Sequence, residues 1–136
     1  PGLIVNLILK DHWGRPRPST IAEFFGPNHY VPPFLISDQC LDNCSFPSGH
    51  AALGFWLVAF ALLTPPVRRR RALWAALVFG AMVGLVRIAQ GGHFLSDVLV
   101  SGMIVVGLTC WLHGRMVPGG DVLTRKNNHP ERSESP

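Results

Sequence analysis

Charged residues are scarce in this chain of 136 residues: Asp, Glu, Lys and Arg make up only 15% of it, whereas 48% of the residues are hydrophobic. That balance is too apolar for an ordinary small soluble domain, and the length allows one domain at most. No internal repeat is visible, and no basic stretch precedes an apolar run ending in small residues, so we expect no cleavable signal peptide. The net charge of +4 is concentrated in clusters such as Arg68 to Arg71, which argues against a nucleic-acid-binding surface.

Four apolar segments dominate the pattern, and they cover residues 2–9, 51–63, 72–86 and 94–112. With their polar flanks, the last three would form helices about 20–30 Å long, which is close to the thickness of a bilayer core. The first looks like the end of a helix, and because the chain starts inside it with Pro1 instead of Met, we expect a truncated N-terminus. Runs of this length are ambiguous, so a soluble bundle of buried helices remains the alternative.

The placement of basic residues favours a membrane bundle. If each segment crosses the bilayer once, residues 10–47 and 87–93 lie on one side, whereas residues 64–71 and the tail after His113 lie on the other. The second side holds eight of the 12 Lys and Arg residues, namely Arg68, Arg69, Arg70, Arg71, Arg115, Arg125, Lys126 and Arg132. Because Lys and Arg concentrate in cytoplasmic loops, we expect this second side to be cytoplasmic.

The connecting segments fit the same topology. Pro65 and Pro66 should end the second apolar segment, because proline removes a donor and clashes with the preceding turn. Residues 11–46 are rich in Pro, Gly, Asn and Asp and need not form regular structure. The apolar side chains of this loop are expected at the membrane interface or at a lipid entrance: Phe24, Phe25, Tyr30, Phe34 and Leu35. We predict a membrane domain over residues 1–117 and a polar, disordered cytoplasmic tail over residues 118–136.

Three groups of polar residues interrupt the apolar pattern, and the crossing order brings all three to the non-cytoplasmic side. They are Lys10 with Arg17, the run Pro47, Ser48, Gly49 and His50, and Arg87 with His93 and Asp97. An ionisable group beside a membrane span is costly unless it has a partner or a function. We therefore expect these residues to meet in one site.

The basic members of this set suggest that the site binds a phosphoryl group. Lys10, Arg17 and Arg87 supply three cations, and the two arginines have the planar fork that matches phosphate oxygens. Ser48 and Gly49 lie where a helix should begin, and helix N-termini expose free N–H groups that bind anions. Catalysis of phosphoryl transfer consists mostly of positioning and electrostatic stabilisation, which such a set can provide.

The two histidines can divide the chemistry of a two-step displacement. One ring nitrogen can attack phosphorus, while the other histidine protonates the leaving oxygen and later activates water. Asp97 follows His93 by four residues, so on a continuous helix the two share a face. A carboxylate in that position can hold the far ring nitrogen and fix the tautomer.

The motifs Lys10-x6-Arg17-Pro18, Pro47-Ser48-Gly49-His50 and Arg87-x5-His93-x3-Asp97 resemble, in order and spacing, those of the type 2 phosphatidic acid phosphatase (PAP2) family, which is related to vanadium haloperoxidases. The resemblance implies an all-α transmembrane bundle, of which this chain would be the C-terminal part of a six-helix core. It also implies that His93 is the nucleophile, Asp97 its orienting partner and His50 the general acid and base. The implied phosphate-binding residues are Lys10, Arg17, Ser48, Gly49 and Arg87, with no metal ion and no cofactor. The family usually has serine where this chain has Val86.

The resemblance predicts an enzyme that hydrolyses a phosphomonoester or pyrophosphate on a membrane lipid through a phosphohistidine. Its site would face the periplasm from a bacterial inner membrane. Trp13-Gly14-Arg15 is similar to members that act on lipid A or undecaprenyl pyrophosphate, while phosphatidylglycerophosphate and phosphatidic acid remain open. The alternatives are a vanadate-dependent haloperoxidase and a non-catalytic membrane protein with the same fold. The oligomeric state is open.

Several remaining polar residues receive simpler interpretations. His12 and Arg15 lie inside the first motif and could touch substrate, but we expect them to be solvated loop residues. We expect Cys110 to be packed within its apolar segment. Cys40 and Cys44 could form a disulfide in an oxidising compartment, but so short a loop restricts the geometry, and both states remain open. No role is assigned to three other histidines, His29, His113 and His129.

Overall fold

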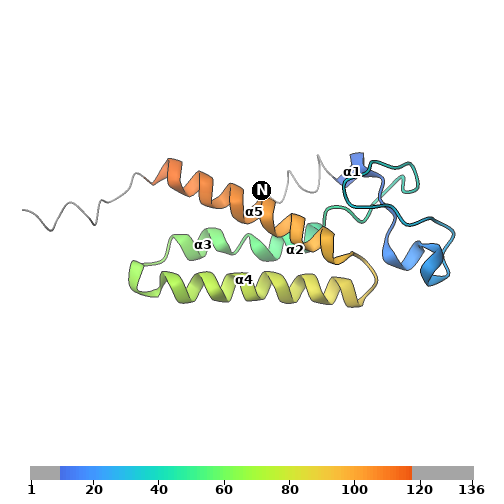
Figure 1. Cartoon of the computed structure of the whole chain (residues 1–136). Helices are drawn as coiled ribbons and strands as arrows, with labels where there is room; N and C mark the ends of the chain where they lie inside the picture. Colours follow the sequence, from blue (N-terminus) through green and yellow to red (C-terminus); the bar gives the residue numbers. More distant parts are fainter. Residues whose placement is uncertain (1–9, 118–136) are drawn as a thin grey trace, which may run out of the picture.

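The structure, a computed structural model, describes residues 10–117, except for the side chains of Lys10 and Asp11 (Figure 1). Its elements are α1 (Lys10–Trp13), η2 (Pro18–Thr20), η3 (Ala22–Phe24), α2 (Gly49–Phe55), α3 (Val58–Leu62), α4 (Pro66–Ala89) and α5 (Leu95–Met116). Within residues 10–117 the only β-type pairing is an isolated bridge between Ile21 and Asn28, so the expected all-α fold is confirmed. The expected helix end at 2–9 and the expected disordered tail at 118–136 lie outside the described residues.

The helices form a small bundle in which α2 and α3 run along α4, and α5 packs across them (Figure 1). The segment from α1 to the start of α2 lies at one end of this bundle. The same end holds the start of α2, the end of α4 and the start of α5, so the three sequence motifs meet there. The first turn of α4, with the arginine run 68–71, lies at the opposite end of the bundle.

Two helix boundaries differ from the prediction. The second apolar segment is not one helix, because it divides into α2 and α3 at Trp56 and Leu57, where Leu57 N–H donates to the carbonyl of Gly54 with i→i+3 spacing at 3.4 Å. Of the connecting residues 64–71, only Thr64 and Pro65 are irregular, because α4 begins at Pro66. Proline is favoured at the first helical position, because the backbone N–H that it lacks would have no hydrogen-bond partner within the helix. Since the helix starts at Pro66, the four arginines lie on it.

Close packing of the helices depends on glycine. A Cβ atom added to Gly54 would lie 3.0 Å from the Cα of Gly80, and one added to Gly102 would lie 2.9 Å from the ring of Phe55. A Cβ on Gly80 would overlap the same ring, and one on Gly84 would overlap Val98 on α5. Small residues at helix contacts let backbones approach closely, which is the usual packing of helices in membranes.

The outward faces of the two long helices are apolar. The most apolar 18-residue windows of α4 and α5 have mean hydropathies of 2.0 and 1.9, yet only 17% and 33% of them is buried. Each helix is long and apolar enough to cross a membrane. Cys110, expected to be packed, is instead exposed on α5. A soluble bundle would bury such faces, so this exposure favours a lipid environment over the soluble alternative.

Candidate functional site

His93 is buried where the chain enters α5. It follows the turn made by Gly91, whose φ is +65°, and it is 1% exposed. Its Nδ1 lies 2.6 Å from the carbonyl oxygen of Ser45. Because a carbonyl oxygen can only accept, Nδ1 carries the proton and Nε2 keeps its lone pair in the neutral ring. Among residues 10–117 the one hydrogen bond of the imidazole is that of Nδ1, so Nε2 has no hydrogen-bond partner there.

Asp97 lies in the first turn of α5 and is fully buried at 0% exposure. Its carboxylate accepts hydrogen bonds from Arg15 and from the Ser45 hydroxyl, and it accepts a third from the backbone N–H of Phe94 at 2.8 Å. The expected partnership with His93 is only partly present, since Oδ2 is 3.8 Å from Nδ1 and no hydrogen bond joins them. Oδ2 is occupied by Ser45 and Phe94, and the imidazole donates to the Ser45 carbonyl instead.

Arg15 is a buried residue of the site, and the expectation that it is solvated is wrong. It is 1% exposed, forms an ion pair with Asp97, and donates to Ser96 Oγ at 2.9 Å and to the Val31 carbonyl at 2.8 Å. Its guanidinium carbon lies 4.1 Å from the centre of the Phe94 ring, which gives a cation–π contact. A buried charge needs such a set of partners, and Asp97 supplies the opposite charge.

Arg87 lies in the last turn of α4 and Arg17 is the N-cap of η2, and each guanidinium is held by hydrogen bonds to its own neighbourhood. Arg87, in the last turn of α4, donates from Nη1 to Gln90 Oε1 at 2.6 Å, and its buried Nε has no hydrogen-bond partner among residues 10–117. A Cβ on Gly92 would lie 3.1 Å from Arg87 Nη2, so glycine leaves room for the guanidinium. Arg17 donates from Nε and Nη2 to the Asn43 carbonyl at 3.0 and 2.8 Å. Lys10 begins α1, but its side chain lies outside the described part.

The second motif starts α2 as predicted. Ser48 is the N-cap, and its buried hydroxyl accepts from the backbone N–H of Ala51 at 3.4 Å. Gly49 is also buried, while His50 is exposed on the first turn of the helix. Ser48 N–H donates to the backbone carbonyl of Asp97 at 3.3 Å, which ties the second motif directly to the third.

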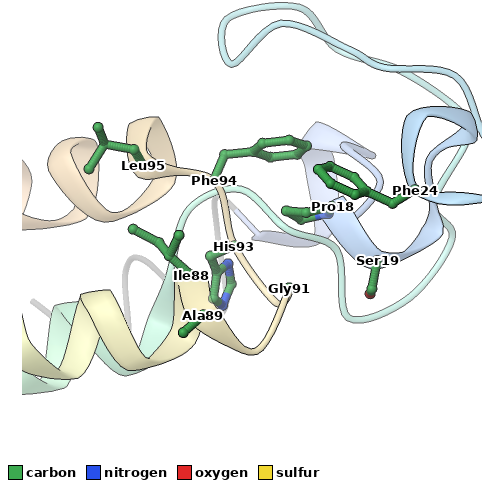
Figure 2. Close-up of a pocket in the computed structure, with 9 residues that line it drawn as sticks. All are labelled: Pro18, Ser19, Phe24, Ile88, Ala89, Gly91, His93, Phe94 and Leu95. Carbon is green, nitrogen blue, oxygen red and sulfur yellow. The ribbon is translucent and has the colours of Figure 1, made fainter.

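An apolar cavity of about 410 Å³ opens beside His93 (Figure 2). Figure 2 shows the imidazole beside Ile88 and Ala89 at the end of α4. The lining residues come from η2, η3, the end of α4, the turn between α4 and α5, and the first residue of α5: Pro18, Ser19, Phe24, Ile88, Ala89, Gly91, His93, Phe94 and Leu95. A mostly apolar wall with one histidine suits an amphiphile whose polar group reaches the imidazole.

The segment 43–45, which none of the three motifs includes, links them. The Asn43 carbonyl accepts from Arg17, Cys44 forms a disulfide with Cys40, and Ser45 contacts both His93 and Asp97. The sequence left open whether Cys40 and Cys44 form a disulfide, and in the structure they do. No spacing or periodicity marks Ser45, and the one sequence signal for Arg15 is its position between Gly14 and Pro16 in the first motif.

The described residues contain no group of three or more His, Cys, Asp or Glu side chains that could hold a metal ion. Their polar groups are arranged as cations and hydrogen-bond donors, together with one free imidazole nitrogen. Such an arrangement can bind an oxyanion and attack it. The expectation of a reaction without metal remains a prediction.

These features define a helical membrane protein with a buried histidine, arginine and aspartate at one end of its bundle. The model of the PAP2 superfamily matches residues 2–118, and the chain belongs to that family, as its three motifs indicated. It has two helices long and apolar enough to cross a membrane, and the relatives described next are bacterial, so we conclude that it is a bacterial membrane protein.

Three relatives illustrate the similarity. The chain is 50% identical over 113 residues to a lipid A 4'-phosphatase of Francisella tularensis subsp. novicida, covering 82% of this chain and 50% of that protein. It is 35% identical over 135 residues to a lipid A 4'-phosphatase of Rhizobium etli, covering 98% and 49%. It is 30% identical over 107 residues to the undecaprenyl-diphosphatase BcrC of Bacillus subtilis, covering 79% and 47%. The chain thus spans about half the length of these relatives, and no solved structure matches it significantly.

Proposed function

We propose that this chain carries the reacting residues of a phosphatase that hydrolyses a membrane lipid phosphate through a phosphohistidine. The observation that carries the proposal is the state of His93. Its Nδ1 proton is committed to a carbonyl oxygen, its Nε2 is free within the described part, and its ring borders an apolar cavity. A neutral imidazole with a bare, oriented nitrogen is the form that can attack phosphorus.

The remaining residues receive roles that follow the family motifs. His50 protonates the leaving oxygen and then activates the water that hydrolyses the phosphohistidine. Lys10, Arg17, Ser48, Gly49 and Arg87 hold the phosphate oxygens. Arg87 has the strongest structural support, because its Nε is buried without a partner among residues 10–117 and an incoming oxyanion could accept from it.

The names of the relatives favour two substrate classes. They are named for lipid A and for an undecaprenyl diphosphate, both of which are amphiphiles that carry phosphate and long hydrocarbon chains. The cavity beside His93 could accept an apolar part of such a lipid. The arginine run at the far end of the bundle supports a cytoplasmic location for that end, which would direct the site toward the periplasm from a bacterial inner membrane.

The test is phosphate release by the full-length protein that contains this chain, in detergent without divalent metal, from lipid A, undecaprenyl diphosphate, phosphatidylglycerophosphate and phosphatidic acid. We expect release from at least one lipid, an acid-labile phosphoenzyme during turnover, and the loss of both in His93→Ala. The matched control is His29→Ala, which removes an exposed loop histidine. Phosphate release that persists in His93→Ala, or bromide oxidation with vanadate in place of phosphate release, would contradict the proposal.

A further inference from the structure

The contacts of Ser45 connect the imidazole of His93 to the carboxylate of Asp97 through a residue outside the three motifs. The Ser45 carbonyl accepts from His93 Nδ1 at 2.6 Å, and the Ser45 hydroxyl donates to Asp97. Both interactions are buried, and Ser45 itself is 0% exposed. The distance of 3.8 Å between His93 Nδ1 and Asp97 Oδ2 is too long for a hydrogen bond.

Arg15 fixes the other side of this arrangement. Its guanidinium forms the ion pair with Asp97, and its backbone carbonyl accepts from the Ser45 N–H at 2.8 Å. Arg15 therefore holds both the carboxylate and the residue that the carboxylate binds. Loss of its charge would leave a buried carboxylate without its ion-pair partner.

The neighbours of Ser45 restrict the same backbone. Cys44 is joined to Cys40, and the Asn43 carbonyl accepts two hydrogen bonds from the Arg17 guanidinium. The Ser45 carbonyl is thus held in place by contacts at three consecutive residues. A backbone oxygen fixed in this way can set both the orientation and the tautomer of an imidazole.

We propose that the Ser45 carbonyl fixes the reactive tautomer of His93, and that Asp97 acts through Ser45 as part of an Arg15–Asp97–Ser45 clamp. The inference rests on the proposed function and deepens it: Arg15 and Ser45 are positioning residues for the nucleophile. It differs from the sequence-based expectation, in which the carboxylate holds the imidazole directly. The clamp delivers His93 with Nδ1 protonated and Nε2 bare, which is the state needed for attack on phosphorus.

The kinetic test compares Ser45→Ala with Ser101→Ala in the full-length protein. Both variants remove a buried hydroxyl near Asp97, but Ser101 Oγ donates to the Asp97 backbone carbonyl at 2.7 Å and does not touch the carboxylate. We expect Ser45→Ala to lower kcat about tenfold with little change in KM, the effect of one lost hydrogen bond, while Ser101→Ala keeps kcat within about twofold. Asp97→Asn should lower kcat further. The double variant should be no slower than Asp97→Asn alone, because both changes act through Ser45.

The role of Arg15 can be tested by comparing two substitutions, one of which keeps the positive charge. Arg15→Met should reduce kcat at nearly constant KM, and Arg15→Lys should recover part of that loss because it restores a charge beside Asp97. If Arg15 served only to hold the loop together, the two variants would have equal kcat values in the folded fraction. That outcome would remove Arg15 from the clamp even if its loss destabilised the protein.

A spectroscopic readout separates this inference from the proposed function, because it needs no turnover. Nitrogen-15 NMR of labelled histidine, with His93→Gln to assign the signal, reports which ring nitrogen is protonated. We expect Ser45→Ala and Asp97→Asn to increase the opposite tautomer to a similar extent, with no further increase in the double variant. The clamp is refuted if Asp97→Asn changes the tautomer and Ser45→Ala does not, or if neither does. Absence of phosphate release by the wild-type protein would instead refute the proposed function and leave this readout interpretable.

Discussion

Replacing Arg15 with methionine should destabilise the protein far more than replacing an exposed arginine. The variant keeps an unbranched side chain but removes a guanidinium that is 1% exposed and paired with a carboxylate that is 0% exposed. Hydrogen bonds to Ser96 Oγ at 2.9 Å and to the Val31 carbonyl at 2.8 Å are lost as well. Breaking a buried ion pair by removing one partner costs about 3–5 kcal/mol, because the other charge remains buried.

A double-mutant cycle separates the ion pair from the other contacts. Asp97→Asn should be destabilising by a similar amount, since it leaves the Arg15 charge buried without its partner. The double variant Arg15→Met with Asp97→Asn removes both charges. It should therefore be less destabilised than the sum of the two single variants by about 2 kcal/mol or more.

The assay is thermal unfolding of the full-length protein in detergent, followed by tryptophan fluorescence. At about 2–4 °C per kcal/mol, a loss of 3–5 kcal/mol corresponds to a decrease in Tm of about 6–20 °C. Arg68→Met is the matched control, because Arg68 is exposed in the first turn of α4, and it should lower Tm by no more than about 2 °C. Equal Tm values for Arg15→Met and Arg68→Met, or simple addition in the double variant, would refute the reasoning about the buried pair.

Three further predictions concern the disulfide, the helix packing and the cavity. Replacing Cys40 and Cys44 with serine should lower the unfolding free energy by about 2 kcal/mol, the entropy of closing so short a loop, and reductant should have the same effect on the wild type only. Gly80→Val places side-chain atoms inside a phenyl ring of α2 and should cost about 1–3 kcal/mol, whereas Gly107→Val, with open space around it, should leave Tm nearly unchanged. Phe24→Ala removes a wall of the cavity beside the imidazole, so it should raise KM for a lipid phosphate about fivefold without changing hydrolysis of p-nitrophenyl phosphate.

The family and the helical architecture could be predicted because they depend on local signals. Three spaced motifs identified the PAP2 superfamily, and apolar runs bounded by polar residues located the long helices. The start of a helix at Ser48 and Gly49 could be predicted from their position before an apolar run, and Ser48 is its N-cap. The start of α4 was placed too late in the sequence, because Pro66 can either end one helix or begin the next. The four arginines after it were assigned to a connecting loop because they are charged.

The internal arrangement of the site depended on contacts that no local pattern encodes. Arg15 and Asp97 are 82 residues apart in sequence, and Ser45 and Asp97 are 52 apart. Arg15 looked solvated because it lies in a loop rich in proline, glycine and charge, where exposed arginines are usual. Its burial becomes visible only when the loop folds back over α5, with Gly14 at a φ of +61° allowing the turn.

The irregular segment before α2 therefore positions the side chains of the site as specifically as the helices do. The three motifs come together at one end of the bundle, but His93 Nδ1 donates to a residue outside them. That acceptor is the Ser45 carbonyl oxygen, and it belongs to a loop held by the Cys40–Cys44 disulfide, by the Arg15–Asp97 ion pair and by hydrogen bonds from Arg17. Because rigid support is what makes a positioned group effective, changes in residues 40–45 should reach the chemistry of His93 without touching any of the three motifs.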